Sequence, residues 1–315
     1  MGLADIFKSF GKAAAEYDRR TLNLSDILRK QDAPGGGSHP SHPFHAPPAH
    51  PPPHPHPPMA GGPGDGGPAP EPPPPPEPPE DASLPEEYDF DEAFAAESFH
   101  GRKRKGIPTP TFGNIKYKNC VIAGRAHQTL RFELSEQNRL IRIRTQDVMD
   151  EFFKETGGKN KPLSVLASLK LWRKVGWKVA GKTHKIQIFA RINRKKREEI
   201  KRAIQMDLGV GLGFILPDSA VKQWSKREPW NVVRKGGERS KAHFGHYVYV
   251  SGYTKLGPVC VTWGRKQPMS WAFVNKYCDE AYAIIDEINT SKKKRYLDVT
   301  KIHKYLENCA ECKDG

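Results

Sequence analysis

The stretch at residues 34–80 constrains the fold most, because almost nothing in it can build a core. It holds 21 of the 29 prolines and six of the twelve histidines of a 315-residue chain, in runs such as HPSHPFHAPPAHPPPHPHPP. Proline lacks a backbone donor, and few apolar side chains are present to offset the entropy of ordering the chain. We predict a disordered spacer with local polyproline-II structure, which divides the sequence into a short N-terminal segment and a larger C-terminal part.

Changes in composition set the expected boundaries of these parts. Residues 81–98 mix acids with aromatics, which is typical of a short linear motif, and four consecutive basic residues follow at 102–105. From about residue 107, helix and strand patterns alternate, which indicates a folded domain. The predicted division is an amphipathic helical segment at 1–31, a disordered Pro/His-rich and then acidic linker at 32–98, a basic cluster at 99–106, a folded domain at 107–290 and a charged tail at 291–315.

Charge is divided unevenly along the chain. Residues 1–98 carry 6 Lys+Arg and 16 Asp+Glu, net −10, and residues 99–315 carry net +25. A domain this basic typically contacts a polyanion, although the same charge also serves simple solubility. We therefore expect nucleic acid or another polyanion as a partner of the basic domain, over which the acidic arm could fold as an intramolecular mask.

Residues 1–20 place Leu3, Ile6, Phe7 and Phe10 at helical spacing, which predicts a short amphipathic helix. The predicted spacer separates this helix from the folded domain, so its apolar stripe needs a surface to dock on. We expect that surface to be a protein partner, a membrane surface or another part of the same chain.

Two further features bear on localisation. No apolar run approaches the roughly 18 residues that span a bilayer, so we expect no transmembrane segment. An N-terminal apolar region typical of secretion is lacking, and the five cysteines fit free thiols in a reducing compartment. We therefore expect an intracellular protein, either cytoplasmic or associated with a virion or with nucleic acid, and not a secreted one.

The pattern within residues 107–290 places helices before the sheet. Helices are predicted at about 120–133, 146–156 and 163–174, then a strand at KIQIFARI, a basic helix at NRKKREEIKRAIQM and a buried strand at GVGLGFILP. The last third alternates like strands at HYVYVSGY and LGPVCVTWG, before a closing helix at VNKYCDEAYAIIDEI. We predict an α+β fold in which N-terminal helices pack on a late antiparallel sheet.

Cys120 opens the first of these helices, with Asn119 as its expected N-cap. A thiol on a first turn lies near the positive end of the helix dipole, which favours the thiolate; the alternative is a small apolar residue filling a core. His246 opens an alternating strand directly after a glycine, where its ring can face a cleft. An isolated histidine there is usually structural, but together with Cys120 it completes the pair that thiol catalysis needs.

Four stretches of the sequence resemble one known family. They are FGNIKYKNCVIAGRAHQTLR, FGHYVYVSGY, CVTWG and PMSWAFVNKYCDEAYAIID, which together cover roughly residues 108–290. The arrangement resembles the papain-like cysteine peptidase fold, and more narrowly a set of bacterial and phage papain-fold proteins with GN…C, GH…VGY, VTWG and MTWAF…YCDEAYA motifs. The resemblance implies that 107–290 is a papain-like domain.

Carried over by position, the resemblance implies a nucleophile at Cys120 and a general base at His246. Asn114, six residues before Cys120, falls where these enzymes place the amide that helps to bind the oxyanion. The residue that orients the histidine precedes a tryptophan in the family; here Thr262 precedes Trp263, where an Asn or Asp is usual. Thr262 can bond to the ring but holds an imidazolium less well than a carboxylate or an amide does.

The expected activity is hydrolysis of peptide or isopeptide-type bonds in a peptide or protein substrate. The alternative is a non-catalytic, polyanion-binding papain-fold protein with a structural or virion-assembly role. We expect no cofactor and no metal: the glycines of LGVGLG lack the Lys-Ser/Thr of a phosphate loop, and CAEC at Cys309 and Cys312 is a single CxxC pair.

Overall fold

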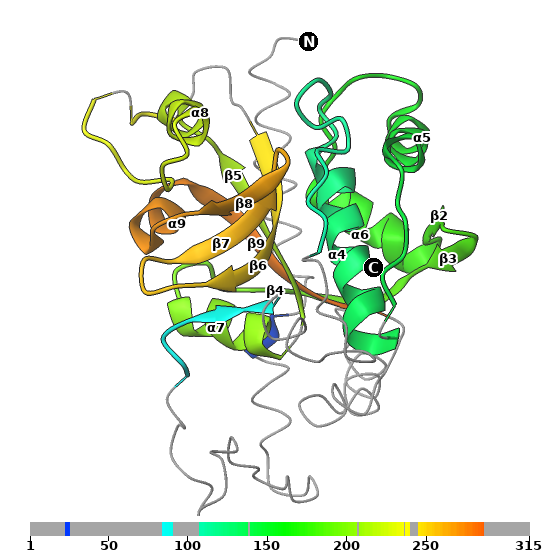
Figure 1. The fold of residues 1–315 in the computed structure, drawn as a ribbon, viewed down its shortest axis with the longest axis horizontal. Coiled ribbons are helices and arrows are strands. Elements are labelled where there is room, and N and C mark those ends of the chain that lie inside the picture. Colours follow the sequence, from blue (N-terminus) through cyan, green and yellow to red (C-terminus); the bar gives the residue numbers. More distant parts are fainter. Residues whose placement is uncertain are drawn as a thin grey trace, which may run out of the picture. The chain divides into compact units, whose positions relative to one another are not determined.

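The fold is described from a computed structural model of the chain, in which residues 23–25, 84–90, 107–137, 139–206, 208–235, 237–239 and 245–286 are described (Figure 1). All of these residues belong to one compact unit, Met1–Gly36 with Leu84–Gly315. The amphipathic helix expected at residues 1–20, the Pro/His-rich stretch, the basic cluster at 99–106 and the tail at 291–315 lie outside the described residues, as do Cys309 and Cys312.

Three helices form one layer beside the sheet (Figure 1). They are α4 (Cys120–Gln137), α5 (Thr145–Thr156) and α6 (Val165–Lys174). Local sequence sets their ends: Ser164 caps α6 by accepting from the Ala167 N–H at 3.3 Å, and Gly157 ends α5 in the left-handed conformation at φ 64°. The three helices predicted before the sheet are therefore present, within a few residues of their expected bounds.

The central helix α4 is covered on nearly every side, although it carries charged residues. Arg125, 2% exposed, donates to Glu155 at 2.6 Å and to Glu151 at 3.3 Å, both on α5, and to Ser168 on α6. A buried guanidinium is tolerated when its donors are paired in this way. The network joins the three helices and fixes the orientation of α4, whose first residue is Cys120.

The main sheet has the strand order β4-β9-β5-β6-β7-β8, and each neighbouring pair is antiparallel. Its strands are β4 (Ile186–Arg191), β5 (Gly209–Ile215), β6 (Gly245–Tyr253), β7 (Pro258–Thr262), β8 (Arg265–Pro268) and β9 (Cys278–Asp286). Shorter elements complete the order: the hairpin β2 (Trp177–Val179) and β3 (Lys182–His184), and the helices α7 (Arg197–Gln205), α8 (Asp218–Ser225) and α9 (Trp271–Tyr277).

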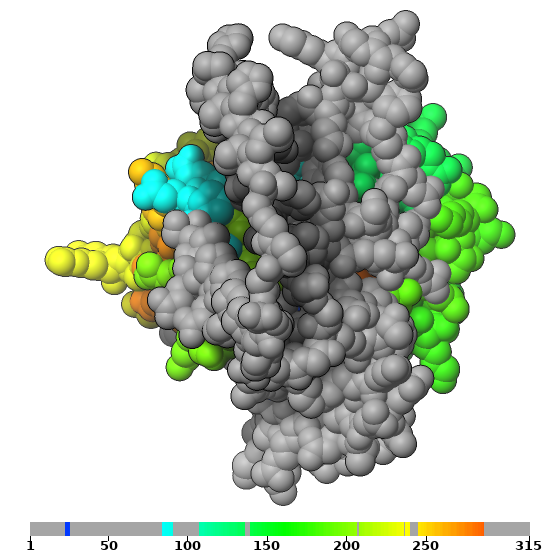
Figure 2. Space-filling view, turned by 90° about the horizontal axis from the view of Figure 1, so that it is seen from below, coloured from blue at the N-terminus to red at the C-terminus, as the bar shows by residue number. Residues whose placement is uncertain are grey.

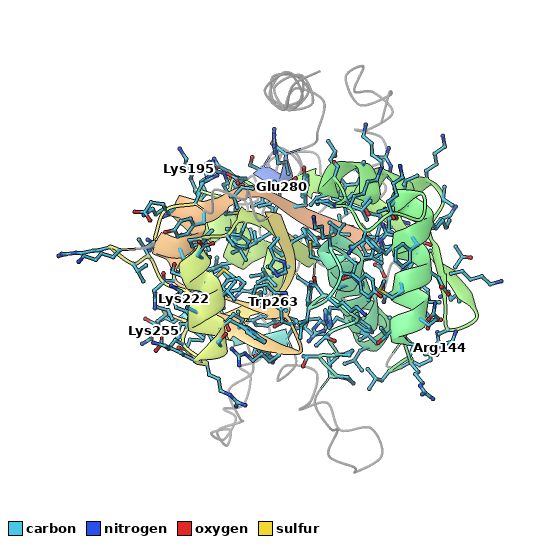
Figure 3. The ribbon with its side chains drawn as sticks, turned by 90° about the horizontal axis from the view of Figure 1, so that it is seen from above. Arg144, Lys195, Lys222, Lys255, Trp263 and Glu280 are labelled. Atoms are coloured by element: carbon cyan, nitrogen blue, oxygen red, sulfur yellow. The ribbon has the colours of Figure 1, made fainter. Side chains whose placement is uncertain are left out.

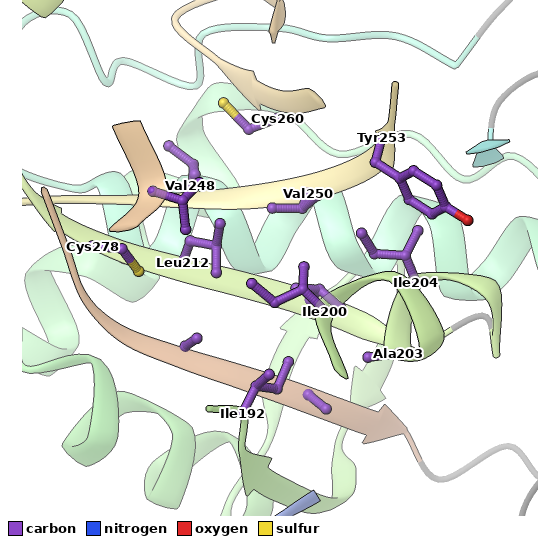
Figure 4. Close-up of a cluster of buried hydrophobic side chains, with 14 of the residues drawn as sticks. Ile192, Ile200, Ala203, Ile204, Leu212, Val248, Val250, Tyr253, Cys260 and Cys278 are labelled. Carbon is purple, nitrogen blue, oxygen red and sulfur yellow. The ribbon is translucent and has the colours of Figure 1, made fainter. Parts of the chain in front are cut away.

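Two clusters of buried side chains hold the layers together. One lies between the sheet and α7 and includes Val248, Val250 and Leu212 from the strands and Ile200 and Ile204 from the helix (Figure 4). The other joins the sheet to α4, α5 and α6. Since successive side chains of a strand point to opposite faces, β6 contributes Tyr247 to the second cluster and Val248 to the first.

The predicted α+β class, with helices first and an antiparallel sheet later, is confirmed. The closing helix predicted at residues 274–288 is wrong beyond Tyr277, where the chain turns into strand β9. Strand β9 lies between β4 and β5 and is buried from Ala281 to Asp286, so its run of Ala, Tyr and Ile packs on both faces of the sheet. Helix propensity in such a run is overridden by tertiary packing.

Two short segments from the N-terminal part of the sequence, residues 23–25 and 84–90, pack within this unit. Leu24 is fully buried in the cluster between the sheet and α7, and Asn23 forms a bridge with Arg191. Within the range predicted as a linker, residues 84–90 instead contain strand β1 (Tyr88–Asp89), which pairs with β6. Figure 2 shows this segment, in cyan, at the surface.

Within the described ranges, no helix is both long and apolar enough to cross a membrane.

Candidate active site

The thiol of Cys120 lies at the N-terminus of α4, facing the start of β6. The backbones of Tyr247 and Val121 lie close enough to the sulfur to lower the pKa of the thiol, although burial, the larger effect, raises it. Four residues further along the same face of α4, Gly124 has the Tyr247 ring against it: a Cβ there would lie 2.7 Å from the ring. The side chain of Cys120 is partly exposed, and the thiol is free. The helix therefore presents the thiol next to the residue that follows His246.

His246 is held by the strand beside its own. Its Nε2 lies 2.7 Å from Oγ1 of Thr262, which is 2% exposed on β7. When Nε2 carries the proton it donates to the threonine oxygen, and Nδ1 is then a proton acceptor. The predicted partnership between His246 and Thr262 is thus present as a hydrogen bond.

Tryptophan rings cover the imidazole. Trp263 stacks on His246 with ring centroids 4.5 Å apart and an interplanar angle of 25°, and Trp230 meets it edge-on at 6.4 Å. Trp224 of α8 packs on Trp263 at 5.4 Å. These rings exclude water from the bond between His246 and Thr262 and leave His246 4% exposed.

The backbone of Trp263 adopts an unfavourable conformation. Its φ of 45° lies in the left-handed region, which L residues other than Gly, Asn and Asp rarely adopt. Gly264 follows with φ 90°, so two successive residues turn the chain from β7 into β8. Such strain persists where the surrounding packing enforces it, and here the enforced feature is the ring above His246.

Asn114 lies in the turn that precedes α4, half-buried, with its backbone N–H donating to the Thr111 carbonyl at 2.9 Å. The same loop is fastened to the turn after β7, because Thr109 Oγ1 donates to the Gly264 carbonyl at 3.0 Å. The loop that carries Asn114 is thereby joined to the turn that carries Trp263.

The expectation that the Asn119 side chain caps α4 is wrong. Its amide instead donates backwards to the Phe112 carbonyl at 2.8 Å and to the Met149 sulfur at 3.4 Å. The Asn119 carbonyl accepts the first hydrogen bond of the helix, from the Ala123 N–H at 2.9 Å. The side chain is needed elsewhere because Phe112, with φ 51°, and Gly113 form a tight turn that it stabilises.

Sequence patterns did not reveal Tyr247 as part of this region. Its ring fills the space above Gly124 on α4 and above Gly211 on β5, where a Cβ would overlap the Tyr247 hydroxyl. That hydroxyl is 3.4 Å from the Gln128 amide nitrogen, one helical turn beyond Gly124. The glycines at positions 124 and 211 were the sequence signal for a large side chain opposite them. They could be read that way only once the pairing of β5 with β6 was known.

Glu280 is a second residue that was missed. It lies on β9 opposite Gly213 of β5, where a Cβ would come 2.5 Å from the Glu280 Cγ, and its carboxylate accepts from the Tyr282 hydroxyl at 3.2 Å. Burial raises the pKa of Glu280, and its negative charge contributes to raising the pKa of Cys120. The predicted closing helix hid this position, since Glu280 reaches the sheet face only as part of a strand.

Burial favours the neutral form of both His246 and Cys120. Burial lowers the pKa of His246 to about 3. Burial also raises the pKa of the Cys120 thiol, against the backbone hydrogen bonds of Tyr247 and Val121, which act in the opposite direction. Burial thus acts on the thiol in the opposite direction to the helix dipole, which favours the thiolate. In the described part of the chain, no group of three or more His, Cys, Asp or Glu side chains is placed to hold a metal ion.

The candidate site therefore combines a half-buried thiol at a helix N-terminus with an imidazole that the adjacent strand holds, both on an α+β fold. No protein-family model matches the sequence, and no curated protein matches it. Among solved structures, the chain is similar to xylellain, a cysteine protease from Xylella fastidiosa, at 12% identity and a TM-score of 0.48, over 65% of this chain and 87% of xylellain.

Two further solved structures are similar over 65% of this chain. A cysteine protease from Carica candamarcensis is covered in full, at 11% identity and a TM-score of 0.44. A ragweed pollen cysteine protease in its proform is covered over 68%, at 14% identity and a TM-score of 0.45. What the site can do chemically depends on the side chains of this chain itself.

Proposed function

We propose that the protein is a cysteine-dependent hydrolase of peptide or isopeptide-type bonds, with Cys120 as the nucleophile and His246 as the general base. The observation that supports this most is the 2.7 Å bond between His246 Nε2 and Thr262 Oγ1, beneath the ring of Trp263. The backbone of Tyr247, the residue after His246, is near enough to the Cys120 sulfur to act on the pKa of the thiol. A histidine fixed at one nitrogen keeps the other in a constant position, which is what proton transfer requires.

The reaction begins from a neutral pair. As the Cys120 sulfur attacks the substrate carbonyl carbon, its proton passes to Nδ1 of His246, and the carbonyl oxygen becomes an oxyanion. The backbone N–H of Cys120 and the side-chain amide of Asn114 are the donors that we assign to this oxyanion. Collapse of the intermediate breaks the C–N bond, and His246 returns the proton to the leaving amine.

A thioester between Cys120 and the acyl group remains after this step. Water then attacks the thioester, giving one proton to His246 and its hydroxyl to the acyl carbon, and the sulfur leaves with the proton that His246 returns. Each half-reaction thus restores a neutral imidazole. With its pKa lowered to about 3 by burial, His246 is unprotonated throughout the neutral and mildly acidic range, and it is a weaker base than an exposed imidazole.

The proposal is tested by hydrolysis of a panel of fluorogenic peptide amides and an unfolded protein, followed for the full chain and three variants. Cys120→Ala and His246→Ala are expected to lose at least about a hundredfold in rate. Cys260→Ala is the matched control, since Cys260 is fully buried in β7 and its thiol belongs to the core. Hydrolysis that survives Cys120→Ala would contradict the assignment.

One observation favours a second candidate, a non-catalytic papain-fold module that binds polyanions. Both the thiol and the imidazole are neutral, whereas an activated pair would carry charge. Under this alternative, binding of the full chain to DNA weakens steeply with salt through counterion release and is unchanged by Cys120→Ala. An absence of hydrolysis by the wild type together with salt-dependent DNA binding would favour it over the hydrolase.

A further inference from the structure

Strand β1 occupies a length of β6 that β5 does not reach. The pairing of β5 with β6 ends at Val210 and Val250, and beyond it Tyr88 pairs with Tyr253 and Asp89 with Gly252. The chain's own residues 84–90 therefore add to β6 as an extended peptide adds to a sheet edge. This place is at the opposite end of β6 from His246.

Gly252 makes this approach possible. A Cβ at this position would overlap the Tyr88 carbonyl oxygen and would lie 3.0 Å from the Asp89 Cα, both of which are backbone atoms that cannot rotate away. The glycine on β6 is therefore matched to a strand lying directly against it. Gly245, at the other end of the same strand, has nothing within 4 Å of the position that an added methyl group would take.

Charge and aromatic contacts add selectivity to the backbone pairing. Lys266 bonds to Asp89 at 2.8 Å, with the two side chains 32% and 23% exposed, and Lys255 bonds to Glu86 at 2.6 Å with both side chains well exposed. The partly covered pair contributes more than the exposed one. The Tyr88 ring stacks on Tyr253 at 6.4 Å, and the Tyr253 hydroxyl donates to the Pro85 carbonyl at 3.0 Å.

Phe90 completes the set of contacts, since it is 4% exposed in the cluster beneath α4. Each contact recognises a chemical feature of the segment EEYDF: an extended backbone, two acids at fixed spacing and two aromatic rings. Figure 3 places Lys255 at the periphery, accessible from outside, and Figure 2 shows the segment itself at the surface. The backbone pairing is two residues long, shorter than most strands, so it supplies few backbone hydrogen bonds.

We propose that Gly252, Tyr253, Lys255 and Lys266 form a peptide-binding surface for acidic, aromatic strands, which residues 84–90 occupy in the same chain and which a partner protein's segment of like chemistry takes by displacing them. Residues 91–106 join the segment to the domain, so it competes as a tethered ligand at high effective concentration. A partner gains access when its own segment binds more strongly or when the tethered one is withdrawn.

The test uses a fluorescent peptide with the sequence of residues 84–90 and the full chain carrying Tyr88→Ala and Asp89→Lys, which disable its own segment. Fluorescence anisotropy is expected to show binding at least about tenfold tighter than to the wild type, whose site is occupied. A peptide with both Glu residues and the Asp replaced by Lys is expected not to bind. Equal binding of the two peptides, or no binding of the first to the disabled chain, would overturn the proposal.

Two further variants, made in the disabled chain, locate the binding to this surface. Gly252→Ala is expected to abolish peptide binding, whereas Gly245→Ala, on the same strand with open space, is expected to keep it. Because Gly252→Ala alters a buried strand, Lys266→Glu serves as a surface variant that tests the same site through charge. Peptide binding that is unaffected by Lys266→Glu would place the peptide elsewhere and contradict the assignment.

Discussion

His246 and Thr262 are sixteen residues apart in sequence, and their side chains meet at 2.7 Å across neighbouring strands. Strands β6 and β7 pair with Tyr249 opposite Val261 and Tyr253 opposite Pro258. This register fixes the contact between His246 and Thr262. A hydroxyl therefore stands where a carboxylate or an amide would hold the ring more strongly. At Nε2 the imidazole is therefore bonded to a neutral group.

Replacing Thr262 by valine keeps the shape of the side chain but removes the hydroxyl that positions His246. We expect kcat to fall at least about tenfold, the cost of one hydrogen bond that holds the base, with KM little changed. Thr262→Ser keeps a hydroxyl and should retain most of the rate. The measurement is steady-state hydrolysis, and a Thr262→Val enzyme with unchanged kcat would remove Thr262 from a positioning role.

The alkylation rate of Cys120 should rise with pH only through the alkaline range. Burial raises the pKa of this thiol above its ordinary value of 9.0, so the thiolate is scarce at pH 7. Iodoacetamide labelling of the full chain, quantified at Cys120 by mass spectrometry from pH 6 to 10, checks this. A rate plateau below pH 8 would mean that the thiol is ionised at neutral pH.

Removing the Trp263 ring should raise the pKa of His246. Burial is what lowers that pKa to about 3, and Trp263 covers one face of the imidazole at 4.5 Å. In Trp263→Leu the pKa is expected to move toward the ordinary value of 6.5, as followed by NMR titration of the imidazole. Trp224→Leu removes the ring one layer further out, and its effect on the pKa should be smaller.

Acid should destabilise the fold through its buried histidines. Burial lowers the pKa of His127, and of His246, to about 3, so between pH 6.5 and 3 the unfolded chain binds more protons than the folded one. The contribution is fully present above pH 6.5, and the free energy of unfolding then falls by up to about 1.4 kcal/mol per pH unit for each histidine.

Denaturant unfolding at pH 7, 6, 5 and 4 measures this slope. His127→Gln leaves the proposed catalytic groups in place and removes one group that takes up a proton on unfolding. The slope of unfolding free energy against pH should therefore fall by about 1.4 kcal/mol per pH unit. An identical slope in this variant would mean that His127 titrates normally in the folded chain.

Gly211→Ala should cost about 1–3 kcal/mol of unfolding free energy, because the added methyl group overlaps the Tyr247 hydroxyl. Tyr247→Leu shortens the opposing side chain, so the double variant should be less destabilised than the two single effects added together. Chemical unfolding of all four proteins gives the interaction energy. Strict additivity would mean that the two residues do not share this space in solution.

The order of helices and strands was predictable because periodicity is a local property. Alternation along β6, and the apolar run of β5 bounded by Gly209 and Pro217, identified both strands without knowledge of their neighbours. The same locality caused the error at β9. The Ala and Glu residues within Cys278–Asp286 favour a helix when that segment is considered alone, and only its burial between β4 and β5 makes it a strand.

The candidate site was predictable to a similar extent. Cys120, His246 and Thr262 came from motifs, and the hydrogen bond between the last two fits the role expected of Thr262. What no motif contained was the burial of the imidazole. Trp263 and Trp230 lie against the ring of His246, Trp224 of α8 packs on Trp263, and burial lowers the pKa of His246. Burial is a property of the assembled fold, so its effect on a pKa cannot be predicted from any single stretch of sequence.

The position of β9 has a consequence for biosynthesis. It is the last described strand in the chain, yet it lies between β4 and β5, so the edges of both remain open until Asp286 has left the ribosome. A nascent chain that stops earlier presents two apolar strand edges that can pair with other chains. The emergence of residue 286 from the ribosome is therefore the event that completes the native sheet.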